Sequence, residues 1–92
     1  MHVTLEYAAQ IKRAAGVASE TFDLPEGGTV HDLLRRAAEA HGDGLRRLLF
    51  DAEGRMHPSL LVFVGDVQVR GSDAATLSPG DRITVLPPIS GG

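Results

Sequence analysis

Hydrophobic and polar residues alternate in several short runs of this chain, and such alternation is typical of strands with one buried face. Residues 3–7 alternate in this way. The run 60–64 is instead continuously apolar and rich in β-branched side chains, which favours a strand covered at least partly on both faces. The pattern therefore predicts five strands, at residues 3–7, 19–24, 60–64, 67–69 and 82–86.

Residues 30–41 have the spacing of an amphipathic helix, with apolar side chains recurring every three or four positions. Thr29 is a candidate N-cap, and Asp32 three residues later completes the pattern of a capping box. Gly42 is a typical residue for the end of a helix. The sequence also predicts a short second helix around 45–49.

The first two strands are expected to pair as an antiparallel hairpin. Their connection, 8–16, has room for a helical turn that ends at Gly16. The order strand, strand, helix, strand, short strand, strand then predicts an α+β fold, a β-grasp (ubiquitin-like) roll. Its mixed sheet has four to five strands, carries one main helix on one face, and places the last strand beside the first. Residues 1–86 are expected to form this domain and 87–92 a flexible C-terminal tail.

The final strand predicts a partner surface. If the helix covers Ile83 and Val85, Leu86 must emerge on the other face of the sheet, because successive side chains of a strand point to opposite faces. Phe63 or Leu61 is expected on the same face as Leu86. An apolar patch beside the end of the chain indicates docking, whereas single apolar residues scattered over a surface are the alternative.

Composition excludes several function classes. The 92 residues allow one domain, and their net charge of -3 with no long Lys/Arg run argues against nucleic acid. The adjacent pairs Arg35-Arg36 and Arg46-Arg47 are interpreted as a solvated face rather than a phosphate site. Cysteine is absent, which excludes disulfides, thiol catalysis and Cys-ligated zinc.

Candidate chemistry is sparse upstream of the C-terminus. The four histidines lack the spacing of metal ligands, so we expect no metal site. No nucleophile–base set is visible, which indicates that the chain is not an enzyme. No apolar run approaches the ~20 residues that span a membrane. Because no signal peptide is recognisable either, we expect a cytoplasmic protein without a membrane partner.

The last residues carry the chemistry. Pro87 and Pro88 favour an extended exit from the domain. Gly91 and Gly92 have no Cβ, so the end of the chain fits a channel too narrow for a side chain. Its carboxylate is a poor electrophile until it is activated, most simply as an acyl-adenylate. The alternative is an ordinary frayed terminus.

Two stretches of the chain resemble the ubiquitin-like sulfur carriers, which include the small subunit of molybdopterin synthase and the thiamine-pathway sulfur carrier. Residues 77–92 contain a Leu, a Gly-Asp turn, a short apolar strand, Pro-Pro, an apolar residue, a small residue and Gly-Gly. Residues 5–16 resemble the first strand of this family and its aromatic-Ala-Gln connector. The resemblance is strong over 77–92 and weaker between the two stretches.

This resemblance implies that an ATP-using, E1-like activating enzyme of the MoeB/ThiF type adenylates Gly92. Sulfide or a persulfide then displaces AMP to give a C-terminal thiocarboxylate. No cofactor is bound, because ATP is used by the partner enzyme. Gly91 is the slim neighbour of the reacting residue and Leu86 lies at the partner interface, while the inserting tail consists of Pro87, Pro88, Ile89 and Ser90.

The receiving pathway stays open among several alternatives. Molybdopterin synthesis leads, with the large subunit of molybdopterin synthase as sulfur acceptor. Residues 46–51 and 54–57 resemble carriers that serve cysteine or natural-product synthesis, so a cysteine-synthase-like or sugar-thiolating acceptor and tRNA thiolation are alternatives. A protein modifier joined to lysines needs the same Gly-Gly end. A binding module with an inert tail is the remaining alternative.

Overall fold

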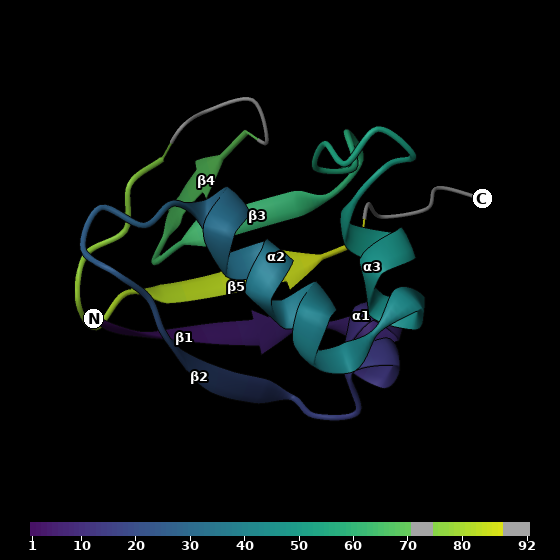
Figure 1. The fold of residues 1–92 in the computed structure, drawn as a ribbon, viewed down its shortest axis with the longest axis horizontal. Coiled ribbons are helices and arrows are strands. Elements are labelled where there is room, and N and C mark those ends of the chain that lie inside the picture. Colours follow the sequence, from purple (N-terminus) through teal and green to yellow (C-terminus); the bar gives the residue numbers. More distant parts are fainter. Residues whose placement is uncertain (71–74, 88–92) are drawn as a thin grey trace.

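The computed structural model describes residues 1–70 and 75–87, which form three helices and five strands. The predicted tail residues 88–92 lie outside the described residues. Figure 1 shows the elements, which follow one another as β1 (His2–Tyr7), α1 (Ala9–Ala15), β2 (Ser19–Asp23), α2 (Val30–His41), α3 (Asp43–Leu49), β3 (Leu61–Val64), β4 (Val67–Val69) and β5 (Arg82–Leu86).

All five strands belong to one sheet with the order β2-β1-β5-β3-β4. β1 pairs with β2 in the antiparallel direction and with β5 in the parallel direction, and β3 pairs antiparallel with both β5 and β4. The sheet is therefore mixed, and the last strand lies beside the first as predicted. Figure 1 shows α2 lying across one face of this sheet, which confirms the α+β roll.

The core lies between the sheet and the helices. The alternating side chains of β1 and β5 that face α2 are buried, as are the apolar residues at helical spacing on α2. Burial of such side chains is the main favourable contribution to folding. The core members from these elements are Val3, Leu5, Tyr7, Ile83, Val85, Val30, Leu33, Leu34, Ala37 and Ala38.

The start of α2 has the predicted capping box. The backbone N–H of Asp32 donates to Thr29 Oγ1 at 3.2 Å, and the N–H of Thr29 donates to Asp32 Oδ2 at 3.0 Å. The hydrogen bond from Thr29 holds the pKa of Asp32 below its usual value. At the other end Gly42 has a φ of 89°, and its N–H donates to the carbonyl of Ala38 at 2.8 Å.

Several elements differ from the sequence prediction in extent, including β1 and β2, whose bounds are each shifted by one residue at one end. Residues 9–15 form a helix of seven residues rather than a single turn, and it ends at Gly16 in the left-handed conformation as predicted. The predicted strand 60–64 begins one residue later, at Leu61. The short second helix is confirmed, and it begins already at Asp43 because Gly42 serves as its N-cap.

Candidate functional site

Three of the eight predicted site residues lie in the described part of the chain. Phe63, Leu86 and Pro87 are all half-buried. The reacting residue Gly92 and its neighbours Gly91, Ser90, Ile89 and Pro88 lie outside the described residues. The described structure therefore shows the point at which the tail leaves the domain, and the surface beside that point.

The tail leaves from a central strand. β5 lies between β1 and β3, and its side chains Ile83 and Val85 are fully buried. Beyond the ladder, the N–H of Ala8 donates to the carbonyl of Val85 at 3.2 Å, just before α1 begins. A strand paired on both sides and anchored in the core gives the tail a fixed starting point.

An apolar patch lies on the open face of the sheet at this starting point. Leu61 is paired with Leu86, and Phe63 with Thr84. Residues directly opposite each other in an antiparallel pair share one face, so the three apolar side chains are neighbours. We call Leu61, Phe63 and Leu86 the tail-side patch. Their predicted placement on one face is confirmed, and their role in docking stays a prediction.

The rest of this open face is polar. Arg82 Nε lies 3.1 Å from Glu6 Oε1, and Thr84 Oγ1 donates to the same oxygen at 3.4 Å. The register places polar side chains of β1 and β2 on this face as well, including Thr4 and Thr21. The tail-side patch is thus the apolar edge of a mostly polar surface, and it is located where the tail begins.

A second polar cluster was not found by sequence reasoning. Tyr7 Oη donates to Glu20 Oε2 at 2.7 Å, and His41 Nε2 contacts the same oxygen. Burial, followed by the hydrogen bond to Glu20, raises the pKa of Tyr7, so the hydroxyl stays protonated as a donor. The cluster joins the end of α2 to β1 and β2. We interpret it as structural.

Two further features of residues 1–70 and 75–87 are the arrangement of their potential metal ligands and the length of their helices. No three His, Cys, Asp or Glu side chains of this part lie together in a way that could hold a metal ion. None of its helices has the length and apolar character required to cross a bilayer.

Comparison with known proteins bears on this site. Residues 5–92 match the model of the ThiS family, a match that includes the Gly-Gly end. The molybdopterin synthase sulfur carrier subunit of Chlamydomonas reinhardtii is 29% identical over 92 residues, which is the whole of both chains. Small archaeal modifier protein 3 of Haloferax volcanii is 33% identical over 93 residues, again over both whole chains.

A solved structure supports the fold independently. The crystal structure of SAMP1 from Haloferax volcanii covers the whole of both chains with a TM-score of 0.90 at 23% identity. At that identity the likeness establishes the ubiquitin-like β-grasp fold, with its five-stranded mixed sheet. Taken with the family match over 5–92, it means that this chain belongs to the ThiS family of ubiquitin-like sulfur carriers and is a carrier protein rather than an enzyme.

Proposed function

We propose that the protein carries sulfur as a thiocarboxylate on Gly92 and delivers it for molybdopterin synthesis. The observation that carries this proposal is the family match, which runs through β5 to the last residue. The full-length similarity to a molybdopterin synthase sulfur carrier subunit supports this choice of pathway. Cysteine, thiosugar or natural-product synthesis and tRNA thiolation are the alternatives for the same chemistry.

The proposed chemistry needs activation of the carboxylate by a partner. The Gly92 carboxylate attacks the α-phosphorus of ATP, giving an acyl-adenylate and pyrophosphate. Sulfide or a persulfide sulfur then attacks the acyl carbon, a C–S bond forms, and AMP leaves as the C–O bond breaks. When a persulfide is the donor, a thiol reductant cleaves its S–S bond to release the thiocarboxylate. This group is a sulfur nucleophile that is ionised near neutral pH.

Delivery returns the carrier to its starting state. The thiocarboxylate sulfur attacks an electrophilic carbon of the acceptor, and a new C–S bond forms as the bond from that carbon to oxygen breaks and the oxygen leaves with the electron pair. Water then attacks the acyl carbon, which breaks the bond between that carbon and sulfur and restores the Gly92 carboxylate. The protein supplies no catalytic side chain in this scheme. It supplies a slender tail, because the Gly91-Gly92 end has no Cβ that blocks entry into a partner's active site.

The described surface supports docking of these partners at one place. The tail-side patch offers apolar area where the tail begins, and Pro87 follows Leu86 directly. An E1-like activating enzyme and a sulfur-accepting enzyme both have to take in the same tail, so we propose that they use the same patch in turn. Apolar anchors near the centre of an interface typically carry much of its binding energy.

A second candidate function is a protein modifier. It is favoured by the full-length similarity to small archaeal modifier protein 3. In that case a lysine amine, rather than sulfide, attacks the adenylated or thioesterified Gly92, and an isopeptide bond forms. The two functions share activation and differ only in the nucleophile.

The experiment that separates them is intact-mass analysis after incubation with an E1-like enzyme, ATP and sulfide. The thiocarboxylate replaces one oxygen by sulfur, a gain of about 16 Da. Adding a molybdopterin synthase large subunit and its sulfur-free pterin substrate should reverse the gain and form product. A cysteine-synthase-like acceptor that reverses the gain in its place would move the proposal to that pathway. Isopeptide remnants on other proteins without any thiocarboxylate would favour the modifier.

A further inference from the structure

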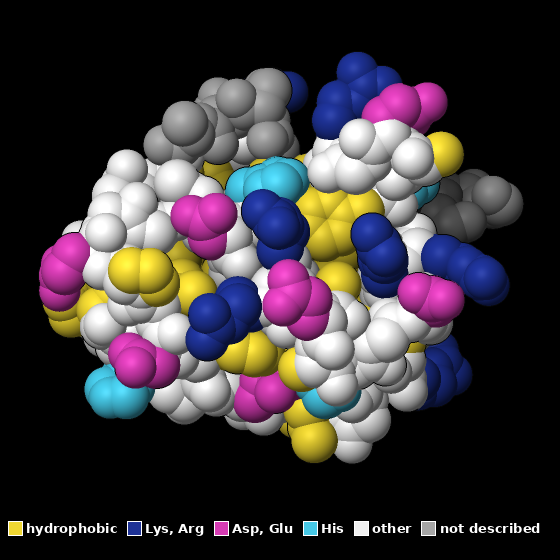
Figure 2. All heavy atoms as spheres, in the orientation of Figure 1, with side chains coloured by type: hydrophobic (Ala, Val, Ile, Leu, Met, Phe, Trp, Pro, Cys, Tyr) yellow, Lys and Arg dark blue, Asp and Glu magenta, His cyan; other side chains and the backbone are white. Residues whose placement is uncertain are grey.

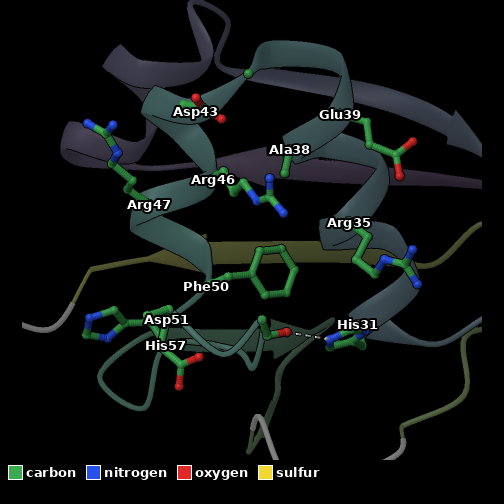
Figure 3. A pocket seen from close by; sticks show the side chains of 13 residues that line it. His31, Arg35, Ala38, Glu39, Asp43, Arg46, Arg47, Phe50, Asp51 and His57 are labelled. Carbon is green, nitrogen blue, oxygen red and sulfur yellow. Dashed lines mark hydrogen bonds between the residues drawn. The ribbon is translucent and has the colours of Figure 1, made fainter.

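A groove on the helix-covered side of the molecule is not used by the proposed function. It lies between α2, α3 and the loop that follows α3, and its volume is about 1210 Å³. Figure 2 shows dark blue basic side chains around an apolar surface on this side, and Figure 3 shows that the central ring is Phe50. The tail-side patch lies on the opposite face of the sheet, so the two surfaces are separate.

The groove arises from the sharp turn at Gly42, which ends α2 and begins α3. This turn brings Arg35 of α2 and Arg46 of α3 to opposite walls. Figure 3 shows Arg46 reaching from α3 toward α2, with Arg35 on the other side of the Phe50 ring. Phe50 is only 7% exposed, and His31 packs edge-on against it with ring centroids 5.3 Å apart. The floor is therefore a fixed part of the core.

The basic side chains of the groove are available to a ligand. The side chains of Arg35, Arg46 and Arg47 are exposed, and none of these side chains forms an ion pair or hydrogen bond with the described part of the chain. Guanidinium groups present a planar set of donors that matches a carboxylate. All three groups line the same groove, on a chain whose net charge is -3.

Part of the nearby negative charge is already engaged in contacts within the protein. The Asp51 carboxylate accepts from the N–H groups of Glu53 and Arg55 at 2.9 and 3.0 Å, and Arg55 Nε lies 3.4 Å from it. Asp43 lies in the first turn of α3, where the positive end of the helix dipole faces it. Neither Glu39 nor Asp43 forms an ion pair with the described part of the chain. The three arginines of the lining therefore outnumber the two carboxylates that have no ion-pair partner.

We propose that this groove docks an acidic segment of a partner protein. The segment would place carboxylates against Arg35 and Arg46 and an apolar side chain over Phe50 and Ala38. The groove is open and much larger than a phosphate ion, and its cations are spread along two helices rather than gathered at one point. Both properties favour an extended segment over a compact anion. Because the tail-side patch remains free, one partner can hold the carrier while another takes the tail.

The test is a titration of the full-length, isotope-labelled protein with a fluorescein-labelled peptide that alternates Glu-Glu with Leu. We expect saturable binding that weakens with salt, with NMR shifts confined to α2, α3 and the loop after α3. The same peptide with Gln in place of Glu should not bind. Combining Arg35→Glu with Arg46→Glu should weaken binding by about tenfold or more. Arg13→Glu, the same charge change at an exposed position of α1, should leave the affinity unchanged.

Thermal melts of all variants, and the milder pair Arg35→Gln with Arg46→Gln, exclude unfolding as the cause of lost binding. Equal binding of the Gln peptide, shifts on the open face of the sheet, or unchanged affinity of the double variant would overturn the proposal. Displacement of the peptide by an equal concentration of inorganic phosphate would also overturn it, in favour of a small-anion site. Sulfur loading of the parent protein is measured separately, and its failure would count against the proposed function alone.

Discussion

Replacing Val85 and Leu86 by alanine, one at a time, should separate stability from partner recognition. The two residues are neighbours on β5 and point to opposite faces. Val85 is 0% exposed in the core, whereas Leu86 is half-buried in the tail-side patch. Both substitutions shorten an apolar side chain at the same strand end, so any difference between them reflects the face and not the strand.

The expected cost in stability follows from burial. Val85→Ala removes two fully buried carbons at about 0.8 kcal/mol each, and the cavity left behind raises the loss to about 2–3 kcal/mol. Leu86→Ala removes three carbons that are only half-buried, for a loss of about 1 kcal/mol. A domain of this length is stable by roughly 5–14 kcal/mol, so both variants should remain folded at room temperature.

The expected cost in activity has the opposite order. Leu86→Ala should lower kcat/KM for sulfur loading by the E1-like enzyme about tenfold, because an apolar anchor worth about 1.4 kcal/mol is lost from the interface. Val85→Ala should load at nearly the parent rate. Thr21→Ala, on the open face but on the distant strand β2, is the matched control and should change neither quantity.

Urea denaturation gives the stability of each variant, and the rate of mass gain at limiting enzyme gives the activity. If Leu86→Ala lost more stability than Val85→Ala, the assignment of the two faces would be wrong. If Leu86→Ala loaded at the parent rate, the tail-side patch would not be the docking surface for the activating enzyme.

Four further predictions concern the fold and sulfur loading. Thr29→Ala should cost about 1 kcal/mol in urea denaturation and Thr29→Ser almost nothing, because only the first loses the cap. The pKa of Asp32 is lowered in the folded protein, so its ionised carboxylate stabilises the fold at pH values above the ordinary pKa of 3.8, and this contribution is lost as pH falls through the lowered pKa. Asp32→Asn should therefore flatten the acid side of the profile of stability against pH. An unchanged profile would contradict this reasoning. Leu34→Asp should abolish cooperative melting, because it places a charge in the buried core. Lys12→Arg removes the only lysine, and sulfur loading measured by intact mass should be unchanged.

Local patterns predicted most of the fold. The capping box at Thr29 and Asp32 and the stop at Gly42 depend on residues a few positions apart, so the sequence displays them directly. The alternation along β5 likewise assigned Leu86 to the open face, and the register then placed Phe63 beside it. These predictions held because propensity, spacing and burial agree at each of these positions.

The groove and the polar cluster could not be predicted in this way. Arg35 and Arg46 belong to separate helices, and they line one groove only because of the angle between α2 and α3 at Gly42. The sequence alone therefore indicated a solvated face for both residues. Glu20 and His41 are 21 positions apart in the chain and come together across α2 and the sheet. Tertiary packing decides such contacts, and a single sequence carries no local signal for them.

The central claim is that Gly92 is the sulfur-bearing residue, and intact mass tests it most directly. The parent protein and a variant lacking Gly92 are incubated with the E1-like enzyme, ATP and sulfide. The account predicts a gain of about 16 Da for the parent protein, and no gain for the shortened protein or without ATP. A folded parent protein that gains no mass, or a shortened protein that gains it equally, would contradict the account.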